Sequence, residues 1–515
     1  MDHSVYYCLV ALLPLVYFLL KSSWKKAPFG SGSRHGLKLP PGPWQLPVIG
    51  SIHHLRGFLA HHALRDLSLR YGPLMFLKLG ELPVVVASTP EAAKEVMKTH
   101  DAIFSTRPLS STIRTVSKDG LGIVWAPYGD HWRQLRKICT MQLLGARRVQ
   151  SLRPAREEEA FRLVRAVMSS STAAGGAAPP PLVDLGKLAA VYVAEASLRA
   201  ILGRRFKVED RDTLLRYVDD GVRLAGGFTP RDLFPSSWLV RALTHRAVRE
   251  VDAYRDSLFA FMDVVVGERL DRRRSTEEEE EEGEDLIDVL LRSHKEGNLP
   301  FPLTMRTIEA DLIGGGIETA TTTLQWAMAE LMRNPGIMAK AQAEVRGLFM
   351  GQTKVTEDRL GELPYLQLVI KETLRLHVPG PLLIPRECQE QCRILGYDVP
   401  RGAMVLVNAW AIARSPDHWE EPDAFVPERF VGDARDFKGN DLEFIPFGAG
   451  RRICPGMSFG LANVELGLAS LLFYFDWSLP AGVLPAEMDM AETMGITARR
   501  KADLFLSATL SVKLP

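Results

Sequence analysis

Residues 444–460 decide the fold, and they read FIPFGAGRRICPGMSFG. Cys454 lies in this stretch among three glycines, Gly448, Gly450 and Gly456. Glycine permits a tight backbone and the close approach of a flat ligand. The pattern turns helical after the next proline, so Cys454 faces backbone N–H groups and the positive end of a helix dipole, which lower the pKa of a thiol. We interpret Cys454 as a thiolate ligand or a nucleophile. The alternative is an inert buried cysteine, which the many glycines disfavour.

Composition excludes several classes of protein. Of 515 residues, 46% are hydrophobic and 24% charged, which excludes a disordered chain, a collagen-like chain and a multi-span membrane protein. The 63 basic and 62 acidic residues give a net charge of +1, so we expect no nucleic-acid partner. Five cysteines are too few for a disulfide scaffold, and their odd number leaves at least one thiol without an internal partner.

The N-terminus carries an apolar run. Residues 5–20 contain no charged side chain, and counted from Met1 the run reaches about 20 residues, enough for a helix to cross a bilayer. Basic residues follow it, at Lys21, Lys25 and Lys26, and this bias keeps the following chain cytoplasmic. We predict an uncleaved membrane anchor over residues 1–21. A cleaved signal or a buried core helix is the alternative.

The remaining chain is predicted to form a stiff linker and one large domain. Residues 22–48 are basic and then rich in proline, which fixes φ and favours an extended segment. Apolar residues recur with helical spacing over 242–274, 304–334 and 363–377. Short β-like runs are fewer, at 74–79, 84–87 and 404–408. Because no break in composition divides residues 49–515, we predict one mainly α domain with a small β portion.

The cysteine loop resembles the haem-thiolate signature of the cytochrome P-450 superfamily, through Phe447, Gly450, Arg452, Cys454 and Gly456. The resemblance extends over essentially the whole chain and implies the cytochrome P-450 fold around haem b. It makes Cys454 the axial ligand of the iron, because a thiolate donates electron density and favours O–O cleavage. It also implies that Phe447 packs near the sulfur, that Gly448 belongs to the haem-binding loop, and that Arg452 pairs with a haem propionate.

Three further residues match a second part of the superfamily pattern. Glu372 and Arg375 stand at i and i+3 in KETLR, which places them on one face of a helix. The segment that contains Arg429, PERF, resembles the superfamily's matching element. The resemblance implies that the three form a buried charge network behind the haem, with a structural role. For Glu372 and Arg375 alone, an exposed helix pair is the alternative.

Residues 311–323 read DLIGGGIETATTT inside a helical pattern. Three consecutive glycines cost roughly 1 kcal/mol each relative to alanine, so we expect the helix to open there and leave room for a diatomic ligand. A glycine-rich packing contact is the alternative. The segment resembles the superfamily's oxygen-binding pattern at Gly315, Gly316, Glu318 and Thr319. That resemblance implies that Thr319 hydrogen-bonds the bound oxygen and that Glu318 helps to relay protons. Gly315 and Ala320 depart from common plant patterns and put pocket size in doubt.

Four more residues are expected to meet the haem propionates. Trp132 and Arg136 stand at i and i+4 in HWRQLRK, and the superfamily pattern adds Arg107 and Arg386 to them. Guanidinium groups suit carboxylates because they donate two parallel hydrogen bonds. A solvated helix charge is the alternative for Arg136.

Basic residues gather in and after the same segment, at Arg133, Lys137, Arg147, Arg148 and Arg153. The resemblance implies that this region meets an acidic partner, NADPH-cytochrome P-450 reductase, and electrostatic steering would speed that encounter. A solvated helix face is the alternative.

By position in the superfamily pattern, the substrate pocket should be lined by Ile113, Val116, Phe228, Leu312, Gly315, Leu382, Leu383, Met494 and Ile496. Such an apolar pocket suits a lipophilic substrate, although several of these residues could simply be core. The chain is most similar to the plant A-type class, and within it to grass enzymes that oxidise terpenoid defence compounds. Indoles, benzoxazinoid precursors, phenylpropanoids, flavonoids and oximes are the alternative substrates.

The resemblance therefore implies a haem monooxygenase that inserts one atom of O2 into a lipophilic molecule, with electrons from NADPH. It implies a single-pass protein of the endoplasmic reticulum membrane whose catalytic domain faces the cytosol. Two alternatives remain: a peroxide rearrangement or dehydration without O2, and a non-catalytic lipophile-binding membrane protein. Thr319 and Glu318 argue against the first, because such reactions need no proton relay.

Overall fold

The computed structural model describes residues 36–57, 59–172, 181–202, 207–226, 228–275, 305–493 and 495–514. Helices dominate the described residues, as predicted, and the strands form small separate sheets. The α-helices are α2 (Ala60–Tyr71), α3 (Pro90–Lys94), α4 (Ser111–Val116), α5 (Asp130–Ile138), α6 (Ala146–Ser151), α7 (Arg153–Thr172), α8 (Leu185–Leu202), α9 (Val208–Gly226), α10 (Pro230–Leu233), α11 (Trp238–Leu243), α12 (His245–Ser275), α14 (Met305–Arg333), α15 (Pro335–Leu348), α16 (Pro364–Leu376), α17 (Ala409–Ile412) and α18 (Met457–Tyr474).

Shorter helical turns and strands complete the description. The turns are η1 (Ile52–His54), η2 (Glu95–Thr99), η3 (Cys139–Leu143), η4 (Glu357–Glu362), η5 (Pro427–Phe430), η6 (Gly450–Arg452) and η7 (Pro485–Glu487). The strands are β1 (Leu74–Leu79), β2 (Leu82–Ala87), β3 (Val183–Asp184), β4 (Arg386–Glu387), β5 (Cys392–Ile394), β6 (Tyr397–Val399), β7 (Met404–Val407), β8 (Phe475–Ser478) and β9 (Phe505–Leu510).

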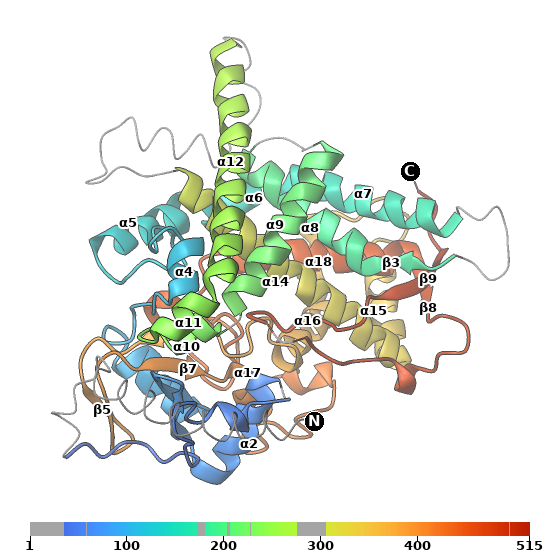
Figure 1. Ribbon diagram of the computed structural model, residues 1–515. Helices are drawn as coiled ribbons and strands as arrows, with labels where there is room; N and C mark the ends of the chain where they lie inside the picture. The colour runs from blue at the N-terminus through green and yellow to red at the C-terminus, as the bar shows by residue number, and fades with distance from the viewer. Residues whose placement is uncertain are drawn as a thin grey trace, which may run out of the picture.

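The long helix α14 forms the centre of the helical part (Figure 1), where it packs against α8 and α18. Its ends follow local sequence signals. Asn334 ends α14 by donating its backbone N–H to Glu330, and Pro335 then begins α15 at a position where its missing N–H costs nothing. Trp326 and Leu324 of α14 are fully buried in the main apolar core. The helix that carries the central part of the site is therefore rigidly held.

Helix α18 joins the cysteine loop to this core. It is apolar around its whole circumference, which is typical of a helix that is buried on all sides. Within the described ranges it is the one helix long and apolar enough to cross a membrane, but 67% of it is buried inside the protein, so we interpret it as a core helix. The predicted anchor over residues 1–21 lies outside the described residues, as does the linker up to residue 35.

The largest sheet has the strand order β1-β2-β7-β4. Strands β1 and β2 are antiparallel, whereas β2 and β7 run parallel with Val84 opposite Met404. Strand β4 pairs antiparallel with β7 and places Arg386 opposite Val405. Figure 1 shows β7, α2 and α17 together at one end of the molecule, away from α7 and α8. This sheet therefore brings Arg386 to the site from a part of the chain distant in sequence.

Two smaller sheets are antiparallel: β3-β9-β8, and the hairpin β5-β6, whose turn contains Leu395 and Gly396. Both turn residues have positive φ, 48° and 81°, the conformation of a type I′ hairpin turn.

Periodicity located the long elements correctly. The helices predicted over 242–274, 304–334 and 363–377 are α12, α14 and α16, each within three residues at either end. The strands predicted at 74–79, 84–87 and 404–408 are β1, β2 and β7. The prediction of a mainly α domain with a small β portion is confirmed. The apolar patterns that predicted these elements come from residues that pack in the core.

Candidate functional site

The cysteine loop turns sharply just before and at the start of η6. Gly448 and Gly450 both have φ of +71°, a conformation that favours glycine. A Cβ atom on Gly450 would lie 2.1 Å from the carbonyl oxygen of Met97 in η2, so a side chain would push the loop off its support. The backbone N–H of Cys454 donates to the carbonyl of Phe447 at 3.0 Å. The loop is therefore held by its own backbone hydrogen bond and packs directly against η2.

The protein alone does not lower the pKa of Cys454, contrary to the sequence prediction. Burial is the largest influence on the thiol and raises its pKa. The backbone N–H of Gly456 and the charge of Arg136 act in the opposite direction but are weaker. Proximity to a helix start was read correctly, but the loss of solvation outweighs it. A bound cation is what would favour the thiolate here.

The glycine-rich turn of α14 leaves open space without breaking the helix. The backbone is helical throughout 305–333, so the predicted opening of the helix is wrong. A Cβ atom built on Gly315 would meet nothing within 4 Å, and Thr319, one turn later, is exposed although Ile317 and Ala320 are buried. The hydroxyl of Thr319 donates to the carbonyl of Gly315 at 2.7 Å. The space arises because the glycines lack side chains. Core packing around α14 offsets the low helix propensity of these glycines.

Glu318 lies beside Thr319 in sequence but is buried among other polar groups. Its carboxylate accepts hydrogen bonds from Arg499, from the Thr497 hydroxyl at 2.9 Å and from the Thr322 hydroxyl at 3.3 Å. Arg499 also pairs with Asp219 of α9. Burial opposes the charge of Arg499, but these carboxylates outweigh it and raise its pKa. No sequence motif marks Arg499, so its contact with Glu318 is seen only in the structure.

The predicted propionate partners form two groups near the cysteine loop. The guanidinium of Arg452 stacks on Trp132, with its carbon 4.2 Å from the ring centroid, and donates to the carbonyls of Ser105 and Ile123 at 2.7 and 3.2 Å. Trp132 also donates to Ile123, at 3.1 Å. Arg136 donates to the carbonyl of Ile453, next to Cys454. Helix α5 is therefore attached directly to the cysteine loop.

The second group comes from the chain around 384 and 101–107. Arg107 donates to the carbonyls of Ile384 and Pro385 at 2.6 and 3.0 Å. Its Nε is buried and has no hydrogen-bond partner among the described residues. Arg386 lies 3.4 Å from Asp101, whose other oxygen pairs with Arg451 at 3.1 Å.

This buried positive charge provides a test of whether the residues fit haem. Burial lowers the pKa of Arg107, and repulsion from Arg386 and Arg452 lowers it further. Burial, followed by repulsion from Arg386 and Arg136, lowers the pKa of Arg452 to about 9. Buried charges that repel one another are stable only with compensating negative groups, and Asp101 supplies one carboxylate. Two propionates would supply the rest, so these residues fit the group that the resemblance implies.

The residues Glu372, Arg375 and Arg429 meet in the core. Arg375 binds both carboxylate oxygens of Glu372 at 2.8 Å, and Arg429 donates to the same carboxylate at 2.9 Å. The side chains of Glu372 and Arg375 are fully buried, so the alternative of an exposed helix pair is wrong. Arg375 also donates to the carbonyls of Ala413 and Pro422, both at 2.7 Å. This network joins α16 to the segments that lead to the cysteine loop.

The predicted pocket residues are only partly brought together. Ile113 is buried in α4 and Val116 is half-buried on its last turn. Phe228 and Leu382 pack against the apolar cluster of the large sheet, so both are partly core residues. Leu383, at φ of +50°, packs against a neighbouring core cluster and lies 3.8 Å from a Cβ built on Gly448.

Helix α9 closes against the segment that contains Ile496, since a Cβ on Gly226 would lie 2.4 Å from the Ile496 nitrogen. Met494 and the side chain of Leu312 lie outside the described residues.

The basic residues behind α5 differ in exposure. Arg133, Lys137 and Arg147 are exposed, and Arg133 pairs with Asp130 at 2.8 Å. Arg148 and Arg153 are half-buried, and Arg153 approaches Glu157 at 3.6 Å. The exposed part of this basic surface is therefore smaller than the sequence indicates.

Comparisons with known proteins cover nearly the whole chain. The family model for cytochrome P450 matches residues 40–504. Desmethyl-deoxy-podophyllotoxin synthase of Sinopodophyllum hexandrum is 46% identical over 97% of this chain and 96% of that protein. Premnaspirodiene oxygenase of Hyoscyamus muticus is 44% identical over 98% of each. Dolabradiene monooxygenase of Zea mays is 46% identical over 91% of this chain and 92% of that protein.

The structure has relatives among solved structures. A zebrafish cytochrome P450 solved with abiraterone superposes with a TM-score of 0.71 at 25% identity, over 88% of this chain and 99% of the other.

Proposed function

Because the chain belongs to the cytochrome P450 family and is therefore a haem-thiolate monooxygenase, we propose that its substrate is a lipophilic terpenoid. The observation that carries this proposal is the 44–46% identity, over nearly the full length, to an oxygenase of premnaspirodiene and a monooxygenase of dolabradiene. Apolar side chains at the predicted pocket positions support it, because an apolar pocket binds a hydrocarbon without leaving polar groups unpaired. A substrate related to desmethyl-deoxy-podophyllotoxin is the second candidate, supported by the synthase of that name at 46% identity.

Cys454 is the residue that we assign as the axial ligand of the haem. The family holds haem through a cysteine thiolate, and Cys454 stands in the matching loop. Bound haem supplies the activation of O2 with NADPH-derived electrons, whereas the protein supplies position and charge. Phe447 and Gly448 shape the loop. The residues that would hold the two propionates are the buried Trp132, Arg107, Arg386 and Arg452 and the half-buried Arg136.

Thr319 and Glu318 are proposed to handle protons. Thr319 Oγ1 faces the space beside Gly315 and can release its bond to the Gly315 carbonyl to donate elsewhere. Glu318 lies one residue away, but its carboxylate is held by Arg499 and Thr497. Glu318 can therefore relay a proton through water to Thr319 only after Arg499 loosens its contact and the freed carboxylate takes up a proton from solvent.

Glu372, Arg375 and Arg429 are proposed to support the cysteine loop rather than to take part in chemistry. Their contacts are buried and reach main-chain carbonyls of neighbouring segments. Such a network fixes backbone position, because each carbonyl it binds would otherwise be unsatisfied in the core.

The family uses a redox partner, and we propose that NADPH-cytochrome P-450 reductase docks on the exposed basic surface of Arg133, Lys137 and Arg147. Positive charge on this surface would steer an acidic partner. We propose further that residues 1–21 anchor the protein in the endoplasmic reticulum membrane, that residues 22–48 link the anchor to the catalytic domain of residues 49–515, and that this domain faces the cytosol.

The experiment that tests this function uses microsomes that contain the full-length protein, a plant reductase and NADPH. A panel of terpene hydrocarbons, indoles, phenolics and desmethyl-deoxy-podophyllotoxin precursors is incubated under 18O2, and products are analysed by mass spectrometry. We expect one labelled oxygen atom in a terpenoid product, and no product with Cys454→Ser. Turnover confined to indoles or phenolics would contradict the terpenoid proposal.

A further inference from the structure

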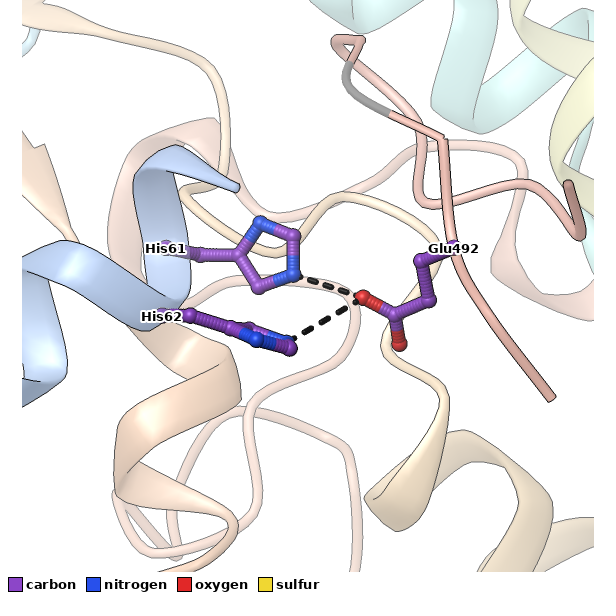
Figure 2. A group of neighbouring side chains, drawn as sticks. All are labelled: His61, His62 and Glu492. Carbon is purple, nitrogen blue, oxygen red and sulfur yellow. Dashed lines mark hydrogen bonds and ion pairs between the residues drawn. The ribbon is translucent and has the colours of Figure 1, made fainter. Parts of the chain in front are cut away.

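A group of chemistry-bearing side chains outside the haem-binding set lies where α2 meets the C-terminal segment. Figure 2 shows the imidazoles of His61 and His62, both from α2, pointing toward the carboxylate of Glu492. His61 Nε2 lies 2.7 Å and His62 Nε2 3.5 Å from the same oxygen, Oε2 of Glu492. The side chains of His61 and Glu492 are only 5% and 7% exposed. Residues separated by more than 400 positions thus converge on one point.

The surrounding residues hold this arrangement in place. The His62 ring stacks on Trp410 of α17, with centroids 4.1 Å apart, and the His61 ring meets it edge-on at 5.2 Å. Asn408 donates to the main-chain carbonyl of His61 at 2.9 Å. Glu492 forms an isolated β-bridge with Arg500, which fixes its backbone. Three separate segments therefore orient the two imidazoles and the carboxylate before any ligand arrives.

One ligand atom in the group has only a long polar contact. Among the residues that the structure describes, His62 Nε2 is buried and approaches only Glu492 Oε2, at 3.5 Å, without the geometry of a hydrogen bond. A buried ring nitrogen without a partner is costly unless something else satisfies it. One ring nitrogen from each histidine and one carboxylate oxygen of Glu492 all lie within 4.8 Å of one another. A metal ion placed between them would use the lone pair that the protein leaves unsatisfied.

The spacing suits a particular class of ion. Zinc bonds of 2.0–2.1 Å in a tetrahedral site place neighbouring ligand atoms about 3.3 Å apart. The two distances to Glu492 Oε2, 2.7 and 3.5 Å, lie on either side of that value. Two imidazole nitrogens and one carboxylate oxygen form a ligand set that zinc accepts, with water in the fourth position. We propose that His61, His62 and Glu492 bind a divalent transition-metal ion, with Zn²⁺ as the best match.

Access and surrounding charge are consistent with this site. A cavity of about 880 Å³ is lined by His62, Trp410 and Glu492 and gives an ion and its water a way in. Arg65, Arg333, Arg414 and Lys501 line the same cavity and oppose a cation, whereas Glu330 and Asp423 favour it. Because basic residues outnumber these acidic ones, a cation can be held here only by direct ligands.

The location suggests what a bound ion would do. The chain continues from Glu492 to Thr497 and Arg499, the residues that hold Glu318. An ion that ties α2 to Glu492 would therefore stiffen the segment that controls Glu318. Its role would be structural, and the haem chemistry would not depend on it directly.

The test uses the full-length holoprotein, purified without a polyhistidine tag and dialysed against a zinc buffer of micromolar free Zn²⁺. Zinc and haem iron are then counted per chain by elemental analysis. We expect one zinc per chain in the wild type and at least about 100-fold weaker binding in Glu492→Ala and His62→Ala, since even outer-shell changes cost 10–100-fold. X-ray absorption at the zinc edge should show nitrogen and oxygen ligands only.

Matched variants separate this proposal from a loss of folding. The His62 side chain is 37% exposed and its polar contact with Glu492 is long, at 3.5 Å, so His62→Ala should fold normally, and its reduced CO spectrum should match that of the wild type. His53→Ala is the control, because His53 and His54 are also adjacent imidazoles, 3.9 Å apart, but His53 meets the carbonyl of Gly50 instead of a carboxylate. No bound zinc in the wild type, or equal zinc in the wild type and His62→Ala, would overturn the proposal.

Discussion

Arg499 binds the carboxylate of Glu318 through Nε and Nη2, and its Nη1 contacts Asp219. The two residues of the main pair are 181 positions apart, and they connect the end of the chain to the centre of α14. Glu318, which we propose relays protons, is therefore held in an ion pair with Arg499. Asp219 can remain paired with Arg499 when that ion pair opens. This relationship makes Arg499 a positioning residue for the reaction.

The first prediction concerns the stability of that pair. Arg499→Met should lower the free energy of unfolding by about 2 kcal/mol, because it leaves Glu318 charged and buried. Glu318→Gln should cost less, and the double variant should cost about 1 kcal/mol less than the sum of the two. Denaturant unfolding of the haem-loaded proteins measures all three. Strictly additive effects would show that the two side chains are not coupled.

The second prediction concerns Thr319. Thr319→Ala should lower the product formed per NADPH by about tenfold or more, with hydrogen peroxide rising in proportion, since a positioned proton donor contributes at least that much. Product and peroxide are measured together in the reconstituted system. Thr321→Val is the control on the same helix, because the Thr321 hydroxyl is buried and has no partner among the described residues. Unchanged coupling in Thr319→Ala would refute its assigned role.

The third prediction compares two glutamate–arginine pairs of the same i,i+3 spacing. Glu372→Ala leaves the fully buried Arg375 without its partner and should cost about 3–5 kcal/mol and reduce haem incorporation. Glu362→Ala removes the partner of Arg359 in a solvent-exposed pair and should change the stability far less, because solvent screens that pair. Thermal unfolding and the haem-to-protein absorbance ratio test both. Similar losses in the two variants would contradict a supporting role for the buried pair.

The fourth prediction concerns pH. Burial, and after it repulsion from Glu357, raises the pKa of Glu465 in α18 from its ordinary value of 4.5 to about 7. Between these values the folded protein holds a proton that the unfolded chain has lost, so this residue's contribution to stability falls as pH rises from about 4.5 to 7. In the wild type, this residue should lower the free energy of unfolding by about 1–3 kcal/mol over that range, and Glu465→Gln should not show this loss. Denaturant unfolding at pH 5, 6, 7 and 8 measures it. Parallel pH profiles for the two proteins would show that Glu465 is not the source.

Local patterns predicted the elements and the cysteine loop, because both depend on neighbours in sequence. Helical spacing located α14 and α16, and glycines around Cys454 marked the loop whose Gly448 and Gly450 have positive φ. The same local reasoning failed at Gly315, where the helix continues because tertiary packing stabilises what propensity disfavours.

Tertiary contacts explain what the sequence did not reveal. The pKa of Cys454 depends on burial by distant segments, and no motif connects Glu318 to Arg499 or His61 to Glu492. The role of a residue such as Arg499 depends on the buried partner that the folded chain brings to it, and its own sequence neighbours do not indicate that partner. The sequence therefore identified the residues of the candidate site through the superfamily pattern, and the structure added the residues that hold them.

The most direct test of the central claim is the reduced CO difference spectrum of the purified, haem-loaded protein. We predict the thiolate-type Soret band in the wild type and in Cys392→Ser, whose cysteine is only partly buried and lies away from the loop in β5, and its loss in Cys454→Ser. A thiolate-type band that persists in Cys454→Ser, or that is absent from the haem-loaded wild type, would contradict the assignment of Cys454 as the haem ligand.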